Sequence, residues 1–146
     1  MSSVLFDSRQ IYVNSKINAL ASSTTDRNAV TVFLNDPILV PSGKVAHVSI
    51  VSAEIPISVT VGNHLYLLVD TSLTSISPFI GKIPIQVPAT YINNYYNYNG
   101  FSIRVNDRTI QQFDVRITDE YGLDVSFGNA TDWSLTLQVD ILNIKP

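Results

Sequence analysis

The chain has 146 residues and a mass of 16.1 kDa, a size at which folding buries roughly 68–70% of the surface of an unfolded chain. This length supplies one hydrophobic core and excludes two independent domains. The net charge is −3, and the nine lysine and arginine residues are scattered without a cluster, which excludes an electrostatic surface for a nucleic-acid backbone. We expect no direct binding of nucleic acid.

The composition also indicates the compartment in which the protein is made and whether a partner covers its apolar surface. Because the chain has no cysteine, disulfides and thiolate metal sites are excluded, which fits a reducing compartment. The start of the sequence lacks a secretion signal, so we expect a soluble protein made in the cytosol. Apolar residues make up 45% and charged residues 14%, a balance that predicts cover of apolar surface by a partner.

Residues 1–28 are rich in serine, asparagine, threonine and aspartate, and only residues 10–13 resemble a short strand. This segment is predicted to be an N-terminal arm, and residues 29–146 are predicted to be the folded domain. Deletion of such an arm is expected to leave the domain folded, because its polar composition cannot bury much apolar area.

Strand signals follow one another through the rest of the chain, separated by proline and glycine. Residues 44–56 have apolar side chains on both faces, which favours a central strand that ends at Pro56. Residues 91–100 are polar and aromatic and are predicted to be a loop. The remaining expected strands cover residues 29–35, 64–70, 75–80, 83–87 and 101–107.

The chain closes with two runs that alternate strictly between apolar and polar residues. In residues 113–118 the apolar face carries a phenylalanine, a valine and an isoleucine, and in residues 133–141 it begins with the single tryptophan. We expect both faces to lie in the core. The predicted core signature comprises Phe113, Val115, Ile117, Gly122, Trp133, Leu135 and Leu137, and Val139 is predicted to be buried beside them.

About eight strands without a long amphipathic helix favour an all-β sandwich. Eight antiparallel strands in two packed sheets form a single jelly roll, although another Greek-key topology has the same periodicity.

The only two histidines, His47 and His64, fall in predicted strands. A metal site of the cupin type requires further ligands beside them, and the sequence offers no His-x-His pair and no third ligand. Calcium would require the nearby carboxylates of Asp119, Glu120, Asp124 and Asp132 to converge, but the spacing lacks the alternation of a calcium loop.

A turn explains this acidic segment better, with the Asp119 side chain bonded to its own backbone and Gly122 in a positive φ. The sequence has no glycine-rich phosphate loop and no visible nucleophile with a base. We therefore expect neither an enzyme nor a bound metal or cofactor.

Tyr91, Tyr95, Tyr96 and Tyr98 are concentrated in one segment, and tyrosine provides large contact area at a low entropic cost. These rings either contact a sugar or protein partner or pack on their own domain. Residues 129–131 match the N-glycosylation pattern, which we interpret as a polar turn because no secretion route is evident.

The motifs KVAHVSIVSAEIP, FDVRITDEYGLDVSF and WSLTLQVDIL resemble the single jelly-roll capsid proteins of virophages, polinton-like viruses and nucleocytoplasmic large DNA viruses. Their chains close with a strand of the form F-x-V-x-I, a D-x-x-G turn and a W-S-L-T-L strand. FDSRQIYVNSK, with Arg9 and Tyr12, resembles their N-terminal arm. The closing motifs match at Phe113, Val115, Ile117, Asp119, Gly122, Trp133, Ser134, Leu135, Thr136 and Leu137.

The resemblance implies a structural virion protein that is made in the host cytoplasm. The major capsid proteins of these double-stranded DNA viruses carry two fused jelly rolls, and one domain of this length cannot supply two. The resemblance therefore implies the penton, a homopentamer at the five-fold vertex of an icosahedral shell, with the major capsid protein and minor capsid proteins as partners. The expected subunit-contact residues are Arg9, Tyr12, Tyr95, Tyr96 and Tyr98.

Three alternatives stay open at this point. The chain is a minor or cement capsid protein, a carbohydrate-binding sandwich of a fibre or head that uses the tyrosines as stacking platforms, or a cupin-like enzyme with a metal at His47 and His64.

Overall fold

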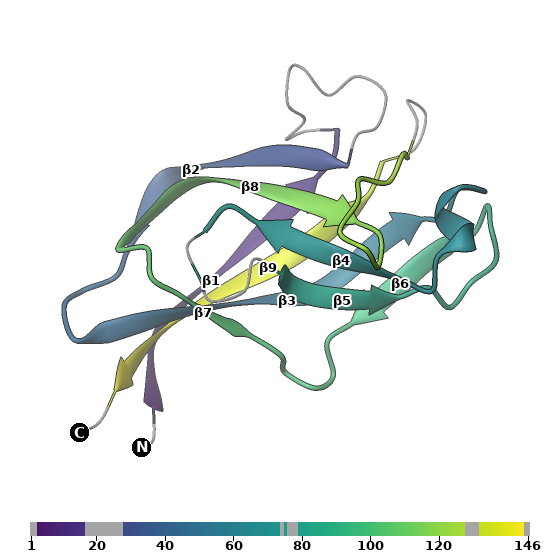
Figure 1. The fold of residues 1–146 in the computed structure, drawn as a ribbon. Helices are drawn as coiled ribbons and strands as arrows, with labels where there is room; N and C mark the ends of the chain where they lie inside the picture. The colour runs from purple at the N-terminus through teal and green to yellow at the C-terminus, as the bar shows by residue number, and fades with distance from the viewer. Residues whose placement is uncertain (1–2, 17–27, 74, 76–78, 128–131, 145–146) are drawn as a thin grey trace.

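The computed structural model is an all-β sandwich of two antiparallel sheets that face each other (Figure 1). It describes residues 3–16, 28–73, 75, 79–127 and 132–144. In these ranges the only helix is a single 3₁₀ turn, η1 (Val61–Asn63). No helix of the described ranges is long and apolar enough to cross a membrane.

The first sheet has five strands in the order β1-β9-β3-β6, and β7 pairs with the same edge of β3 as β6 does. β6 and β7 therefore act as one interrupted edge strand. Its strands are β1 (Ser3–Asn14), β3 (Lys44–Pro56), β6 (Ile92–Tyr96), β7 (Ile103–Val105) and β9 (Ser134–Ile144).

The second sheet has four strands in the order β2-β8-β4-β5. β2 and β5 are its two edges, and in Figure 1 β2 lies above β8 and β5 lies below β4. Its strands are β2 (Ala29–Leu39), β4 (Tyr66–Thr71), β5 (Phe79–Pro84) and β8 (Thr109–Thr118).

The strand pairs are nested along the chain, with the first strand paired to the last. Inside that pair, β2 joins β8, then β3 joins β6 and β7, and finally β4 joins β5. An antiparallel ribbon wound over two sheets in this way is a single jelly roll. The prediction of a single jelly-roll sandwich is confirmed. Because β6 and β7 share one edge of β3, the nine strands occupy the eight positions of a jelly roll.

Residues 3–14 are not part of a detached arm. β1 pairs with β9 along its whole length, from Ser3 opposite Ile144 to Asn14 opposite Ser134, and the side chains of Ile11 and Val13 are buried. Serine, glutamine and tyrosine on the outer face hid this alternation in the sequence. The predicted boundary at residue 28 is therefore wrong for β1, and residues 17–27 of the predicted arm lie outside the described ranges.

The predicted tyrosine-rich loop contains the strand β6. The sequence did not predict this strand because its inward residue, Asn93, is polar. Asn93 is buried, its Oδ1 accepts a hydrogen bond from the Gln86 amide at 2.9 Å, and its Nδ2 donates to the Pro84 carbonyl at 3.0 Å. Asparagine in an inward position breaks the apolar alternation by which strands are recognised. The same bonds tie β6 to the chain that leaves β5.

The core lies between the inward faces of the two sheets, and the apolar residues of the predicted core signature are buried there together with Val139. Gly122 of the signature is only half-buried, in the turn after β8. Trp133 is completely buried, and its ring centroid lies 6.4 Å from that of Phe127. Gly122 has φ +80°, as the predicted turn requires.

A glycine on β5 allows the two sheets to approach closely. A side chain at Gly81 would collide with the end of the buried Ile50 side chain of β3, with the Cγ1 atom of Ile50 at 3.3 Å. We expect Gly81→Ala to lower the free energy of unfolding by about 1–3 kcal/mol, the usual cost of overpacking, in a urea titration. Gly62→Ala is the control, because its nearest neighbours lie at an ordinary 3.4 Å.

If steric conflict is the cause, shortening Ile50 must relieve it. Gly81→Ala combined with Ile50→Val is expected to be less destabilised than the sum of the two single variants, because the two sites share one space. Strict additivity would contradict the close approach.

Candidate functional site

Twelve large apolar side chains are exposed in the described ranges, and they fall into three groups. The first flank is the side of the sandwich formed by the edge strands β1 and β2, and it carries Tyr12, Phe33 and Leu39. The second flank is the opposite side, formed by β5, β6 and the connection after β6, and it carries Ile92, Tyr96, Tyr98 and Phe101. The loop end comprises the connections 57–65, 85–91 and 119–127, and it carries Val59, Leu65, Tyr91, Tyr121 and Leu123.

Backbone hydrogen bonds hold the first two connections of the loop end, 57–65 and 85–91, together. The Ile57 amide donates to the Tyr91 carbonyl at 2.9 Å, and the Thr90 amide donates to the Ile57 carbonyl at 2.6 Å. The Ile85 amide donates to the Leu65 carbonyl at 3.0 Å. The exposed side chains of the loop end therefore stand on a connected base rather than on separate loops.

A histidine and a glutamate join the third connection to this base. His64 Nδ1 lies 2.7 Å from Glu120 Oε1, and Glu120 Oε2 accepts a hydrogen bond from the Leu65 amide at 3.0 Å. The hydrogen bond from His64 is the main cause that lowers the pKa of Glu120 below its ordinary value. His64 Nε2 also lies 4.0 Å from Asp119 Oδ2.

Because the pKa of Glu120 is lower in the folded state, its interactions stabilise the fold above the ordinary glutamate pKa. This stability is lost as the pH falls below the ordinary glutamate pKa and through the lowered pKa of Glu120, where the carboxylate gains a proton. We expect the urea midpoint of Glu120→Gln to fall less than that of the wild type between pH 7 and pH 3. Glu54→Gln, at the only other glutamate, is the control and is expected to keep the wild-type pH dependence.

The acidic turn has the predicted structure. Asp119 Oδ1 accepts hydrogen bonds from the amides of Tyr121 at 2.8 Å and Leu123 at 3.0 Å, and Gly122 supplies the positive φ. The other two carboxylates of the segment have separate partners, since Asp124 pairs with an arginine of β8 and Asp132 accepts a bond from Ser15.

The histidines belong to different surroundings. His47 Nδ1 lies 3.4 Å from Ser102 Oγ, whereas His64 belongs to the loop end. In the part of the chain that the structure describes, no group of three or more histidine, cysteine, aspartate or glutamate residues is arranged to hold a metal.

A strained residue lies in the same end. Thr90 has φ +76°, a left-handed conformation that a β-branched side chain rarely adopts. Strain of this kind costs of order 1–3 kcal/mol and persists where the surrounding structure imposes it, commonly at functional positions. The bond between the Thr90 amide and Ile57 is one element that imposes it here.

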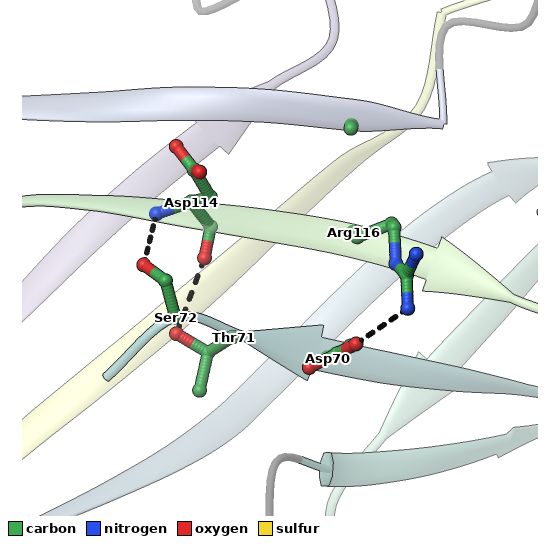
Figure 2. Close-up of a pocket in the computed structure, with 6 residues that line it drawn as sticks. Asp70, Thr71, Ser72, Asp114 and Arg116 are labelled. Carbon is green, nitrogen blue, oxygen red and sulfur yellow. Dashed lines mark hydrogen bonds and ion pairs between the residues drawn. The ribbon is translucent and has the colours of Figure 1, made fainter. Parts of the chain in front are cut away.

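A hollow of about 270 Å³, with polar residue types along most of its lining, lies on the outer face of β4 and β8 (Figure 2). Figure 2 shows Arg116 and Asp70 pointing toward each other, with Nη2 2.8 Å from Oδ2. The Asp114 amide donates to Ser72 Oγ at 2.8 Å, and Thr71 Oγ1 donates to the Asp114 carbonyl at 3.2 Å. These groups bind one another across the two strands, so the hollow fastens the sheet rather than offering a reactive group.

The predicted contact residues divide between the two flanks. Arg9 reaches β2, where it hydrogen-bonds the Asp36 carbonyl and pairs with the Asp36 carboxylate at 3.3 Å, while Tyr12 is exposed on the outer face of β1. On the opposite flank, the rings of Tyr96 and Tyr98 have centroids 6.0 Å apart. Because Arg9 and Tyr12 lie on one flank and Tyr96 and Tyr98 on the other, the predicted contact residues cannot form one site within a single chain.

Tyr95 differs from its neighbours because its side chain points inward at the edge of the sandwich. It packs against the core, and burial raises the pKa of its hydroxyl. It borders a second hollow of about 530 Å³ on the second flank, which we name the flank cavity.

The sequence did not single out several exposed residues of these surfaces. Tyr121 and Leu123 flank Gly122 inside a recognised polar turn, and a large apolar side chain in such a turn has no access to the core. The presence of large apolar residues in this turn was the sequence feature that could have indicated an exposed contact surface. The pattern at residues 129–131 lies outside the described ranges.

No protein-family model matches the chain, and no curated protein matches it either.

Proposed function

We propose that the protein is the penton of an icosahedral shell, a homopentamer that closes the five-fold vertex of a double-stranded DNA virus. The observation that carries the proposal is the distribution of exposed apolar side chains over two opposite flanks and one end of a single jelly roll. The resemblance of the closing strands to the capsid proteins of such viruses gives the same assignment.

A closed ring requires each copy to present two different surfaces, because each copy contacts one neighbour on each side. The first and second flanks differ in their strands and in their side chains, as a head-to-tail contact demands. A two-fold dimer would need only one self-complementary surface. The sandwich therefore has the arrangement that a ring uses.

The loop end is suited to surround the axis of the ring. Five of its exposed side chains are large and apolar, and its carboxylates have partners within their own chain, with Glu120 bonded to His64 and the Leu65 amide and Asp124 paired with Arg116. Carboxylates that are already hydrogen-bonded or paired within their own chain need no partner from a neighbouring copy at the axis. In the virion, the outer sides of the ring would contact the double jelly-roll major capsid protein.

The mass of the protein in solution tests the proposal. We expect light scattering coupled to size exclusion to give five times 16.1 kDa at high protein concentration. Subunit contacts of standard size bury ~1,600 Å² in total and dissociate on dilution when they are weak. A stable dimer or trimer would contradict the penton assignment and favour a minor capsid or fibre protein.

The same light-scattering measurement also tests whether the loop end lies at the axis of the ring. Leu123 is 63% exposed, so Leu123→Asp is expected to leave folding intact and to reduce the pentamer by placing five like charges around the axis. Ser126→Asp introduces the same charge at another exposed position of that connection and is expected to reduce the pentamer less.

A further inference from the structure

The flank cavity has a floor from the second sheet and a wall from the first. Its floor is formed by outward residues of β4 and β5, which include Leu68, Phe79 and Lys82. Its wall is formed by Tyr95 of β6 and by Asn99 and Phe101 of the following connection. The described lining residues are mostly apolar, and Lys82 is the single charged residue among them.

The wall is held in place before any partner arrives. Asn97 Nδ2 donates to the Phe101 carbonyl at 2.9 Å, and the Phe101 amide donates to Asn97 Oδ1 at 3.2 Å. Gly100 closes this turn with φ +66°. Lys82 Nζ lies 4.2 Å from the ring centroid of Tyr66, which directs the ammonium group over that ring. A preformed cavity loses little entropy on binding.

The first flank carries an exposed aromatic side chain, Phe33, that suits the apolar lining of the flank cavity. Phe33 of β2 is 66% exposed, and the register of β2 with β8 shifts immediately after it. Such an irregularity bends the strand and redirects its side chains. Three residues further on, the carboxylate of Asp36, which pairs with Arg9 at 3.3 Å, is 89% exposed, so an accessible carboxylate accompanies the aromatic ring.

We infer that Phe33 of one copy inserts into the flank cavity of the next copy, with Asp36 facing Lys82. An aromatic ring entering an apolar hollow is a typical anchor of an interface, and the opposite charges favour this pairing over a cavity facing a second cavity, which would bring two lysines together. The inference rests on the proposed function for the closure of the ring at five, but the contact itself is defined by the two flanks.

The absence of cysteine makes a direct test possible, because only introduced thiols react. Asn35→Cys places a thiol beside Phe33, and Asn99→Cys places one at the cavity wall. A short bismaleimide is expected to give covalent dimers when the two variants are mixed and none with either variant alone. Asn63→Cys on η1, mixed with Asn35→Cys, is the control and is expected to give no product.

The double variant Asn35→Cys/Asn99→Cys is expected to give a ladder of cross-linked chains that ends at five. Phe33→Ala, which removes an exposed ring and leaves the core intact, is expected to raise the concentration needed for assembly at least about tenfold. Circular dichroism and thermal unfolding verify that this variant is folded.

The two proposals fail in different ways. Pentamers by light scattering without the mixed cross-link, and with normal assembly of Phe33→Ala, would overturn the inference and leave the penton assignment standing. A mixed cross-link with a ladder that ends at another number, or does not end, would support the contact and overturn the five-fold ring.

Discussion

Replacing Trp133 by alanine is expected to lower the free energy of unfolding by about 3–5 kcal/mol, the usual cost of removing a large ring from a core. The ring is completely buried against Phe127, and the Trp133 amide donates a hydrogen bond to Ser15 Oγ at 3.0 Å. The substitution therefore removes apolar contacts and leaves a cavity, while the backbone pairing is kept.

The measurement is a urea titration followed by far-UV circular dichroism, because Trp133 is the only tryptophan and its fluorescence is lost in the variant. Trp133→Phe keeps an aromatic ring at the same position and is expected to lose less stability than the alanine variant. A loss below about 1 kcal/mol in Trp133→Ala would contradict its position in the core.

Deletion of residues 1–16 is expected to prevent folding, contrary to the expectation for a detached arm. It removes β1, exposes the edge of β9 and takes away the buried side chains of Ile11 and Val13. It also removes Ser15, whose amide donates to the Trp133 carbonyl at 2.9 Å. Each buried apolar side chain contributes about 1.5–3 kcal/mol, against a total stability of 5–15 kcal/mol for a typical domain.

The dispersion of amide resonances and the cooperativity of unfolding report whether the truncated chain folds. Two substitutions in β1 provide the matched comparison. Val13→Asp buries a charge and is expected to be severely destabilising, whereas Tyr12→Asp faces solvent on the neighbouring position and is expected to be mild. A truncated chain that unfolds cooperatively would contradict the role of β1.

The closing strands could be predicted from the sequence because their alternation is strict and their inward residues are all apolar. β8 and β9 follow this pattern, and their inward residues are buried as expected. β6 could not be recognised, since the inward Asn93 is hydrogen-bonded to backbone groups of Pro84 and Gln86, at and just after the end of β5. A polar residue with such partners is indistinguishable from a loop residue in the sequence alone.

The surfaces were less accessible to prediction than the core. The Asp119 turn follows from local chemistry and was predicted correctly, whereas the pair of His64 and Glu120 joins residues 56 positions apart. That pair exists only because the connections after β3 and β8 leave the sandwich at the same end. In the same way, the tyrosines were recognised as a group, but their division between an inward Tyr95 and outward Tyr96 and Tyr98 depends on β6 being a strand.

A reconstruction of particles that contain this protein tests the central claim most directly, because it gives the copy number and the position of the chain together. We predict five copies around each five-fold vertex, with the loop ends toward the axis and the first flank of each copy against the second flank of the next. Density for the chain between the major capsomers, or in a fibre outside the shell, would contradict the penton assignment.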